Sequence, residues 1–324
     1  MQTRSRPWLF LLFLTLFFAT APIVVLYTAG WRYSFEHGRI LQTGILSIES
    51  IPRGAQIFLD GRMERERTPA VIDTVLPGDH LVELRREDSL PWKKNLTVES
   101  RQTTFAQTII LWIDALPELT DEASVPALGA GEPSQETLER IRVRTLQGQV
   151  AVNRQTPQGQ ITIAYLPPGT YQLRYAPPGW VLLQNDHSKQ AFLIDESGKE
   201  SPIVLSAKMK FVDWMLEGEP KLLWSDGFDV QVYHLKTHAS ETLTRVSHPI
   251  TGLAWHPSGF AVLYAQENGV FAIDLDARGG RILTSLAAGA DIRDVRVDED
   301  GSRAYFFGRV EDKRGWFVFV LALD

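Results

Sequence analysis

The fold is decided by two stretches near the end of the chain, residues 254–275, AWHPSGFAVLYAQENGVFAIDL, and residues 296–321, RVDEDGSRAYFFGRVEDKRGWFVFVL. Each reads as three short apolar strands separated by two polar turns. Two similar stretches come earlier in the chain, around residues 175–195 and 213–235. The first turn of each copy carries a glycine, and these glycines recur at intervals of about 40 residues: Gly179, Gly218, Gly259 and Gly301.

A repeat of about 40 residues with several strands is typical of a β-propeller blade, because one sheet cannot bury both of its faces without neighbours. The turns at 256–259 and 299–302 resemble the SPDG turns of WD-repeat and TolB-like propellers. Residues 140–324 hold four clear units and a weaker fifth, at the lower end of the four to eight blades that usually close. We therefore expect a small or incomplete β-propeller over 140–324.

Residues 40–113 alternate apolar and polar side chains with a period of two, which indicates short β-strands. The dipeptide Asp60-Gly61 is a hairpin signal, because a type I′ turn needs positive φ values that glycine tolerates. Further turns are expected at Thr68-Pro69 and Pro77-Gly78.

The same segment resembles the PEGA domain, a small β-sandwich of bacterial and archaeal envelope proteins. Pro52, Gly54 and Ala55 fit the motif that names the family, with Arg53 where the family often has Glu. The loop at 87–91 departs from the Gly-Tyr that the family commonly has before its tryptophan. The lead-in at 26–44 is similar to that of membrane-anchored PEGA proteins of candidate-phylum bacteria. The resemblance implies a β-sandwich in an envelope protein and names no ligand.

An alternative exists for residues 140–206. This stretch also looks like a degenerate second PEGA-like unit, since Thr156-Pro157 and Pro168-Gly169 resemble the turns of the first. Three blades would then remain, which implies an open stack of sheets or closure by a partner.

Residues 7–31 contain no charged side chain and are expected to form one transmembrane helix. About 20 apolar residues cross the roughly 30 Å hydrocarbon core as a helix. Trp8 lies at one end, and Tyr27 and Trp31 at the other, where amphipathic rings favour the lipid–water boundary. The alternative is a cleaved signal peptide, because residues 19–21 have the small-x-small pattern of a cleavage site.

The remaining segments complete the predicted organisation. Residues 1–6 are expected to be a short cytoplasmic tail, so that the bulk of the chain is exported, although cations flank both ends of the helix. Residues 114–139 are rich in Pro, Ala, Gly, Ser and acidic residues and are expected to be a flexible linker between domains.

Composition excludes several classes of function. The chain has 324 residues and a net charge of −6 without a basic block, which argues against nucleic-acid binding. It has no cysteine, which excludes disulfides and thiolate chemistry. No nucleophile motif, phosphate loop or metal-ligand spacing occurs, so the sequence predicts no catalytic, cofactor-binding or metal site and no cofactor.

Several residues were weighed as functional candidates. His234 and His238 are interpreted as strand and turn residues rather than ligands. The acidic run 298–300 is interpreted as a turn, and the pair Asp274 and Asp276 cannot be placed across a cleft from sequence alone. Tryptophans recur in the repeats, and most are expected in the core, with those near a central face available to stack on sugars or peptides: Trp180, Trp214, Trp224, Trp255 and Trp316.

The sequence therefore favours a non-catalytic scaffold or binding protein of the cell envelope, anchored by one helix, with its bulk outside the cytoplasm. Its expected partners are the membrane and either envelope proteins or cell-surface glycans. One alternative is a propeller-based hydrolase of glycans or peptides, which predicts clustered carboxylates in one central pocket. Another is a signalling or assembly subunit that acts through its membrane helix.

Overall fold

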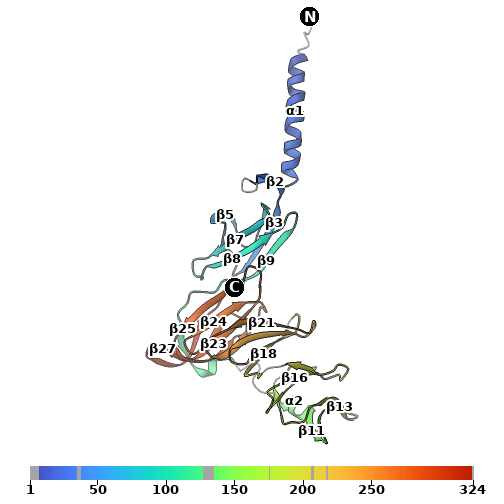
Figure 1. Cartoon of the computed structure of the whole chain (residues 1–324). Helices are drawn as coiled ribbons and strands as arrows, with labels where there is room; N and C mark the ends of the chain where they lie inside the picture. The colour runs from blue at the N-terminus through green and yellow to red at the C-terminus, as the bar shows by residue number, and fades with distance from the viewer. Residues whose placement is uncertain are drawn as a thin grey trace. The chain divides into compact units, whose positions relative to one another are not determined.

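A computed structural model gives the structure of the protein (Figure 1). It describes residues 7–34, 38–126, 135–174, 176–205, 208–216 and 218–322. Internal contacts divide the chain into two compact units: Met1–Leu111 with Arg278–Gly280 and Asp324, and Trp112–Ala277 with Arg281–Leu323. Strands make up 57% of the structure and helices 9%, so the prediction of an all-β protein with one apolar helix is confirmed.

Helix α1, Pro7–Thr28, is apolar around its whole circumference and contains Pro22. The span Trp8–Thr28 has a mean hydropathy of 2.6, and its side chains are unburied. Its threonine hydroxyls donate to carbonyls one turn earlier, as in the 2.8 Å bond from Thr15 Oγ1 to the Leu11 oxygen, so these three polar groups are hydrogen-bonded within the helix. Within the described ranges this is the one helix long and apolar enough to cross a membrane, a property that a signal sequence shares.

The chain after α1 turns into a two-stranded hairpin. Helix α1 stops three residues before the predicted end at 31, because Gly30 adopts a φ of 81° and strand β1, Trp31–Ser34, begins directly after it. Strand β1 pairs antiparallel with β2, Arg39–Gln42. The tail at 1–6 lies outside the described residues.

Two facing sheets form the PEGA-like part of the first unit. The order of one sheet is β6-β3-β9 and that of the other is β5-β4-β7-β8. The strands are β3, Gly44–Ile51; β4, Gln56–Leu59; β5, Arg62–Arg67; β6, Ala70–Val75; β7, Gly78–Arg85; β8, Trp92–Val98; and β9, Thr103–Ile110. Strands β3 and β9 pair in parallel, which closes the sandwich from both ends of its sequence. The most deeply buried side chains come from both sheets: Leu46, Ile48, Ile57, Val82, Leu84, Leu96 and Val98.

The motif residues of this sandwich act through the backbone. The β4–β5 turn has positive φ values at Asp60, 50°, and Gly61, 78°, as the hairpin prediction requires. The buried hydroxyl of Thr68 accepts a 3.0 Å bond from the Ala55 backbone N–H and lies 2.7 Å from the Ser50 hydroxyl. These contacts stabilise the chain around the turn and leave the motif a structural role.

The second unit contains five sheets within its described residues. Their strands are β11, Ile141–Leu146; β12, Gln149–Thr156; β13, Gly159–Leu166; β14, Tyr171–Arg174; β15, Trp180–Asn185; β16, Ala191–Asp195; β17, Ile203–Leu205; β18, Phe211–Met215; β19, Lys221–Ser225; β20, Asp229–His234; β21, Ala239–Arg245; β22, Ile250–Trp255; β23, Ala261–Gln266; β24, Gly269–Asp274; β25, Leu283–Ala288; β26, Ala290–Val297; β27, Arg303–Val310; and β28, Lys313–Val320. A sheet of three strands, β11 to β13, comes first, and four-stranded antiparallel sheets follow.

The repeat predicted from the sequence matches the sheets. Each of the four later sheets has its first turn, between its first and second strands, at one of the repeated glycines. All four adopt positive φ, the backbone region that favours glycine: Gly179 at 93°, Gly218 at 72°, Gly259 at 74° and Gly301 at 77°. The period therefore arises from one turn geometry repeated in successive sheets.

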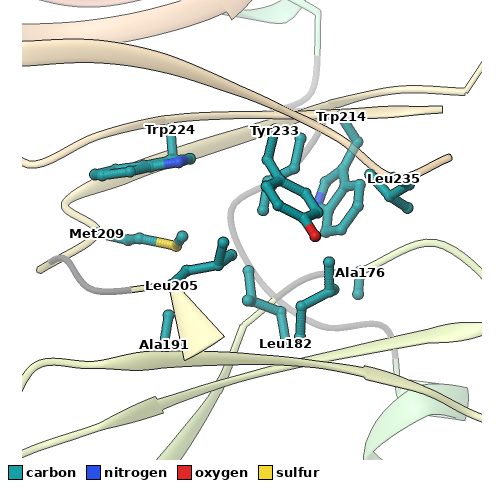
Figure 2. Close-up of a cluster of buried hydrophobic side chains, with 11 residues drawn as sticks. Ala176, Leu182, Ala191, Leu205, Met209, Trp214, Trp224, Tyr233 and Leu235 are labelled. Carbon is teal, nitrogen blue, oxygen red and sulfur yellow. The ribbon is translucent and has the colours of Figure 1, made fainter. Parts of the chain in front are cut away.

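Neighbouring sheets bury their faces against one another, as expected for blades. Figure 2 shows one such interface, where Trp214, Trp224 and Tyr233 of the β18–β21 sheet pack toward Leu182 and Ala191 of the preceding sheet. Similar apolar clusters join the β11–β13 sheet to β14–β17, and β18–β21 to β22–β25. The first strands β22 and β26 also contact each other. This is a propeller-like stack in which each sheet supplies part of its neighbour's core.

The last sheet takes a strand from the start of the unit. Strand β10, Glu118–Thr120, pairs antiparallel with β28, which gives the order β10-β28-β27-β26. These residues fall inside the segment 114–139 that was expected to be a flexible linker. Part of that segment also forms the short helices η1, Glu122–Ser124, and α2, Gln135–Arg140, while residues 127–134 lie outside the described ranges.

Residues 140–206 form sheets of the blade type. Both the β11–β13 and the β14–β17 sheets are antiparallel meanders in which each strand pairs with the next. The PEGA-like sandwich instead joins its first and last strands in parallel. The topology of 140–206 therefore differs from that of a second PEGA-like unit.

Candidate functional site

The second unit contains a pocket of about 530 Å³ beside the first strands of its later sheets. The residues that line it combine three cations, three aromatic rings, aliphatic side chains and two carboxylates: Glu122, Arg174, Lys210, Phe211, Val212, Thr251, Gly252, Leu253, Arg293, Asp294, Phe307 and Trp316. They come from η1, from β14, from β18 and the residue before it, from β22, and from three strands of the last sheet. Residues far apart in sequence thus meet because β14, β18 and β22, the first strands of three successive sheets, lie beside the same space as the last sheet.

Strands β18 and β22 present their edges to the pocket. Successive side chains of a strand point to opposite faces, yet Phe211 and Val212 both line the pocket, as do Thr251, Gly252 and Leu253. Each of these strands is the first of its sheet and pairs on one side only within the sheet. The pocket wall is therefore made partly of backbone, as Gly252, which has no side chain, shows directly.

The last sheet contributes rings that support arginine side chains. Phe307 on β27 and Trp316 on β28 are cross-strand partners, with ring centroids 5.7 Å apart in an edge-to-face arrangement. The guanidinium carbon of Arg293 lies 4.6 Å from the centre of the Phe307 ring, and that of Arg296 lies 4.8 Å from the Trp316 ring. Such cation–π contacts hold a guanidinium in place, and that of Arg293 keeps its N–H edge available for a ligand.

Two more cations come from the neighbouring sheets. The Lys210 ammonium lies 5.2 Å from the centre of the Phe211 ring. Arg174 donates a 3.2 Å hydrogen bond to the Lys210 carbonyl, which joins the end of β14 to the start of β18. Burial lowers the pKa of the Arg174 guanidinium, so this charge is held in a partly desolvated place. In the described part of the chain, the guanidinium and ammonium groups of Arg174, Lys210 and Arg293 form no ion pair.

The two carboxylates of the pocket differ in whether a cation neutralises them. Asp294 accepts bonds of 3.0 and 2.7 Å from Nε and Nη2 of Arg296, which also donates to the Pro126 carbonyl at 2.7 Å. Glu122 is exposed in η1. Because Arg296 neutralises Asp294, the three cations without ion pairs outweigh the remaining carboxylate, and the pocket is electropositive.

A buried carboxylate nearby joins two sheets and is not part of the lining. Asp213 on β18 accepts 2.8 Å bonds from the backbone N–H groups of Trp214 and of Trp255 on β22. Burial raises the pKa of Asp213 to about 6, against the lowering effect of these two bonds. Both oxygens are engaged by backbone, so this group positions strands.

A buried histidine joins the last two sheets at their first turns. His256 Nε2 donates to the Gly301 carbonyl at 3.1 Å, and its Nδ1 accepts from the Ser258 N–H at 3.2 Å. The ring also packs edge-to-face on Trp112, with centroids 5.5 Å apart. Burial lowers the pKa of His256, which keeps the imidazole neutral and its tautomer defined. This turn residue is therefore a structural clamp.

The other charged candidates from the sequence lie in ordinary strand and turn positions. His234 ends strand β20, where its Nε2 is 3.8 Å from Glu241, and His238 lies in the next turn, 3.2 Å from the Tyr233 hydroxyl. Asp298 and Asp300 accept hydrogen bonds from backbone and side-chain groups of residues 302 and 303, and these bonds stabilise their own turn. Asp274 accepts from the Ile282 N–H at 2.7 Å. In the ranges covered by the structure, no three His, Asp or Glu side chains are arranged to hold a metal ion.

The tryptophans of the repeats fall into two groups: four belong to the apolar clusters between sheets, and one lines the pocket. Trp214 and Trp224 are buried between two sheets, Trp180 packs against the same cluster, and Trp255 is buried in the next one. Trp316 is the repeat tryptophan that lines the pocket. The cations Arg174, Lys210 and Arg293 were not foreseen, because they occupy unlike positions in three different sheets and share no spacing. The signal available in the sequence was the neighbouring pair Lys210-Phe211, which is weak alone.

Comparisons with known proteins identify the PEGA part of the first unit. Residues 43–109 match the PEGA domain family. Among solved structures, the C-terminal WD40 domain of Sif2 is similar, with a TM-score of 0.38 and 13% identity. The alignment covers 75% of this chain and 66% of that one, slightly under two thirds of its length. A search of curated proteins found no match.

These findings define a general class of protein by its domains and its N-terminal helix. The chain joins a PEGA domain to a stack of propeller-like sheets, an organisation that points to a binding or protein-interaction role. The N-terminal helix has the length and composition of a membrane anchor or a signal sequence, and PEGA domains occur in extracellular regions.

Proposed function

We propose that the protein is a non-catalytic binding protein of the cell envelope, held to the membrane by α1 with its β domains outside the cytoplasm. The observation that carries this proposal is the pocket of the second unit, where cations supported on rings surround a space of about 530 Å³. Such a surface recognises an anionic group with defined geometry. The partner is an envelope protein or a cell-surface glycan.

The anchor supports the location. Helix α1 is unburied and long enough to span a bilayer, and its threonine hydroxyls are hydrogen-bonded within the helix. Arg32, which follows it, stacks on Tyr27 with its guanidinium carbon 3.6 Å from the ring centre. A tyrosine and a cation at the end of the helix are suited to the interface between lipid and water.

The geometry of the pocket carboxylates favours binding over hydrolysis. A glycan hydrolase of the usual kind needs two carboxyl groups that face each other across the scissile bond. Of the two carboxylates in the lining, Asp294 is already engaged by Arg296. Asp213, whose raised pKa would suit a general acid, has both oxygens bound to backbone N–H groups.

The experiment has two measurements on the full-length protein. The first determines, in the cells that produce it, whether the chain remains in the membrane fraction after alkaline extraction and whether its N-terminus is intact. The second uses the protein in lipid nanodiscs to capture envelope proteins and glycans, with empty nanodiscs as the control. A soluble mature chain cut near residue 21 would contradict the anchor. Turnover of captured peptide or glycan would favour the hydrolase.

A further inference from the structure

The charged groups of Arg293, Lys210 and Arg174 form no ion pair among the described residues, although ion pairs form elsewhere on the same unit. Arg293 and Lys210 are exposed, Arg174 is partly buried, and each is held by a ring or a backbone carbonyl. Arg245, by comparison, is 80% exposed and still lies 3.5 Å from Asp229. Three oriented cations around one space form a receptor for carboxylate or another oxyanion.

The rings of this pocket are poorly placed to stack on a sugar. The Phe307 ring carries the Arg293 guanidinium, and the Trp316 ring carries that of Arg296. Phe307 also lies against Trp316 edge to face. The third ring, Phe211, lies 5.2 Å from the Lys210 ammonium, so each ring of the pocket already has a cation over it and offers a sugar less room to stack.

The strand edges at the pocket favour an extended peptide. Residues 211–212 of β18 and 251–253 of β22 line the space edge-on. An extended chain laid along such an edge gains main-chain hydrogen bonds, and its alternate side chains point to opposite sides. Val212 and Leu253 also line the space, and both are only half-buried, so each offers an apolar contact to such a chain.

We infer that the pocket binds an extended acidic peptide segment of a partner protein, with carboxylates at Arg293, Lys210 and Arg174 and apolar side chains against Val212 and Leu253. This inference rests on the proposed function and specifies the chemistry of the partner. Alternation of acidic and apolar residues is the pattern that satisfies both kinds of contact from one extended chain.

The test uses the full-length chain in lipid nanodiscs and three fluorescein-labelled probes. The first is an eight-residue peptide of alternating glutamate and leucine, the second replaces each glutamate by glutamine, and the third is an oligomer of uronic acid. Fluorescence anisotropy is recorded at low and at physiological salt. We expect the glutamate peptide to bind at least about tenfold more tightly than the glutamine peptide and the uronate, with an affinity that falls as salt rises.

Substitutions locate the binding. Arg293→Gln and Lys210→Gln remove exposed charges, so the fold should tolerate them, and each is expected to weaken the glutamate peptide about tenfold. Arg245→Gln is the matched control and should change affinity less than twofold, since Arg245 lies outside the lining. A thermal melt of each variant confirms that it is folded.

Each outcome decides the inference. Equal binding of the glutamate and glutamine peptides, preferential binding of the uronate, or no binding up to millimolar concentration would each overturn it. Loss of binding in the Arg245→Gln control would overturn the location. If envelope partners are still captured and Arg293→Gln leaves that capture unchanged, the inference fails while the proposed function stands. If nothing is captured at all, the proposed function itself fails.

Discussion

The clamp between His256 and Gly301 gives the sharpest test of the structure of the second unit. Gly301 adopts a φ of 77°, and a Cβ atom built there would lie 2.8 Å from Cε1 and Nε2 of the His256 ring. Gly259 adopts nearly the same φ, 74°, but a Cβ atom there would meet nothing closer than Met215 at 3.8 Å. Alanine at the two positions therefore separates backbone strain from displacement of the histidine.

The magnitudes follow from these two geometries. Gly259→Ala should lower the free energy of unfolding by about 1–2 kcal/mol, the energy needed to hold alanine in the left-handed backbone region. Gly301→Ala should cost that energy and the bond from His256 to the Gly301 carbonyl, whose loss leaves a buried donor unsatisfied for about 1–3 kcal/mol more. For a unit of this size the difference is roughly 2–10 °C in melting temperature.

The assay is thermal unfolding of the full-length chain in detergent micelles, followed by tryptophan fluorescence, since Trp112 lies against the His256 ring. Both alanine substitutions are repeated in a His256→Ala background, where there is no histidine bond to lose. The losses of stability caused by Gly259→Ala and Gly301→Ala should then agree within about 0.5 kcal/mol. Equal costs of the two single substitutions, or an extra cost of Gly301→Ala that persists without the histidine, would refute the reasoning.

Three further predictions concern other parts of the fold. Because the pKa of Asp213 is raised from 3.8 to about 6, its contribution to stability is fully present only below pH 3.8 and is lost as the pH rises through 6. Asp213→Asn should remove this dependence, so the stability of the variant relative to wild type should grow by about 2 kcal/mol between pH 4 and pH 7. An equal pH dependence of the melting temperature in both proteins would contradict this. Thr68→Val deprives the Ala55 N–H of its acceptor, so urea unfolding should show the first unit destabilised by about 1–3 kcal/mol. Thr97→Val, at an exposed position, is the control, and a similar loss of stability there would show that the effect is not specific to the buried bond. Leu119→Pro removes a backbone N–H from β10, so it should lower the free energy of unfolding by about 1 kcal/mol or more and speed hydrogen exchange in β28. Leu116→Pro, at an exposed position outside the strand, is the control. Unchanged exchange in β28 would show that β10 adds nothing to the sheet.

The sequence predicted what depends on local chemistry. The repeat was visible because each first turn needs a positive φ, which places glycine at 179, 218, 259 and 301. The hairpin at Asp60-Gly61 and the apolar helix were visible for similar reasons, since turn geometry and membrane thickness restrict the residues allowed.

The features that the sequence did not reveal depend on distant pairing. Strand β10 has only three residues, too few for a detectable period, and its partner β28 follows much later in the chain. The pocket is assembled from side chains at different depths of several sheets, so Arg174, Lys210 and Arg293 share no motif. The sequence predicts that some of the repeat tryptophans are available for binding, but nothing in the local sequence of Trp316 distinguishes it from the buried Trp255.

The pairing of β10 with β28 also sets an order on biosynthesis. The ribosome makes β10 early, and its partner emerges only after every other strand of the unit. Until then, the edge that will receive β10 does not exist, and the backbone of β10 has no partner strand. The last sheet therefore cannot complete its four strands until β28 is made, and before then the unfinished unit exposes strand edges that can pair wrongly.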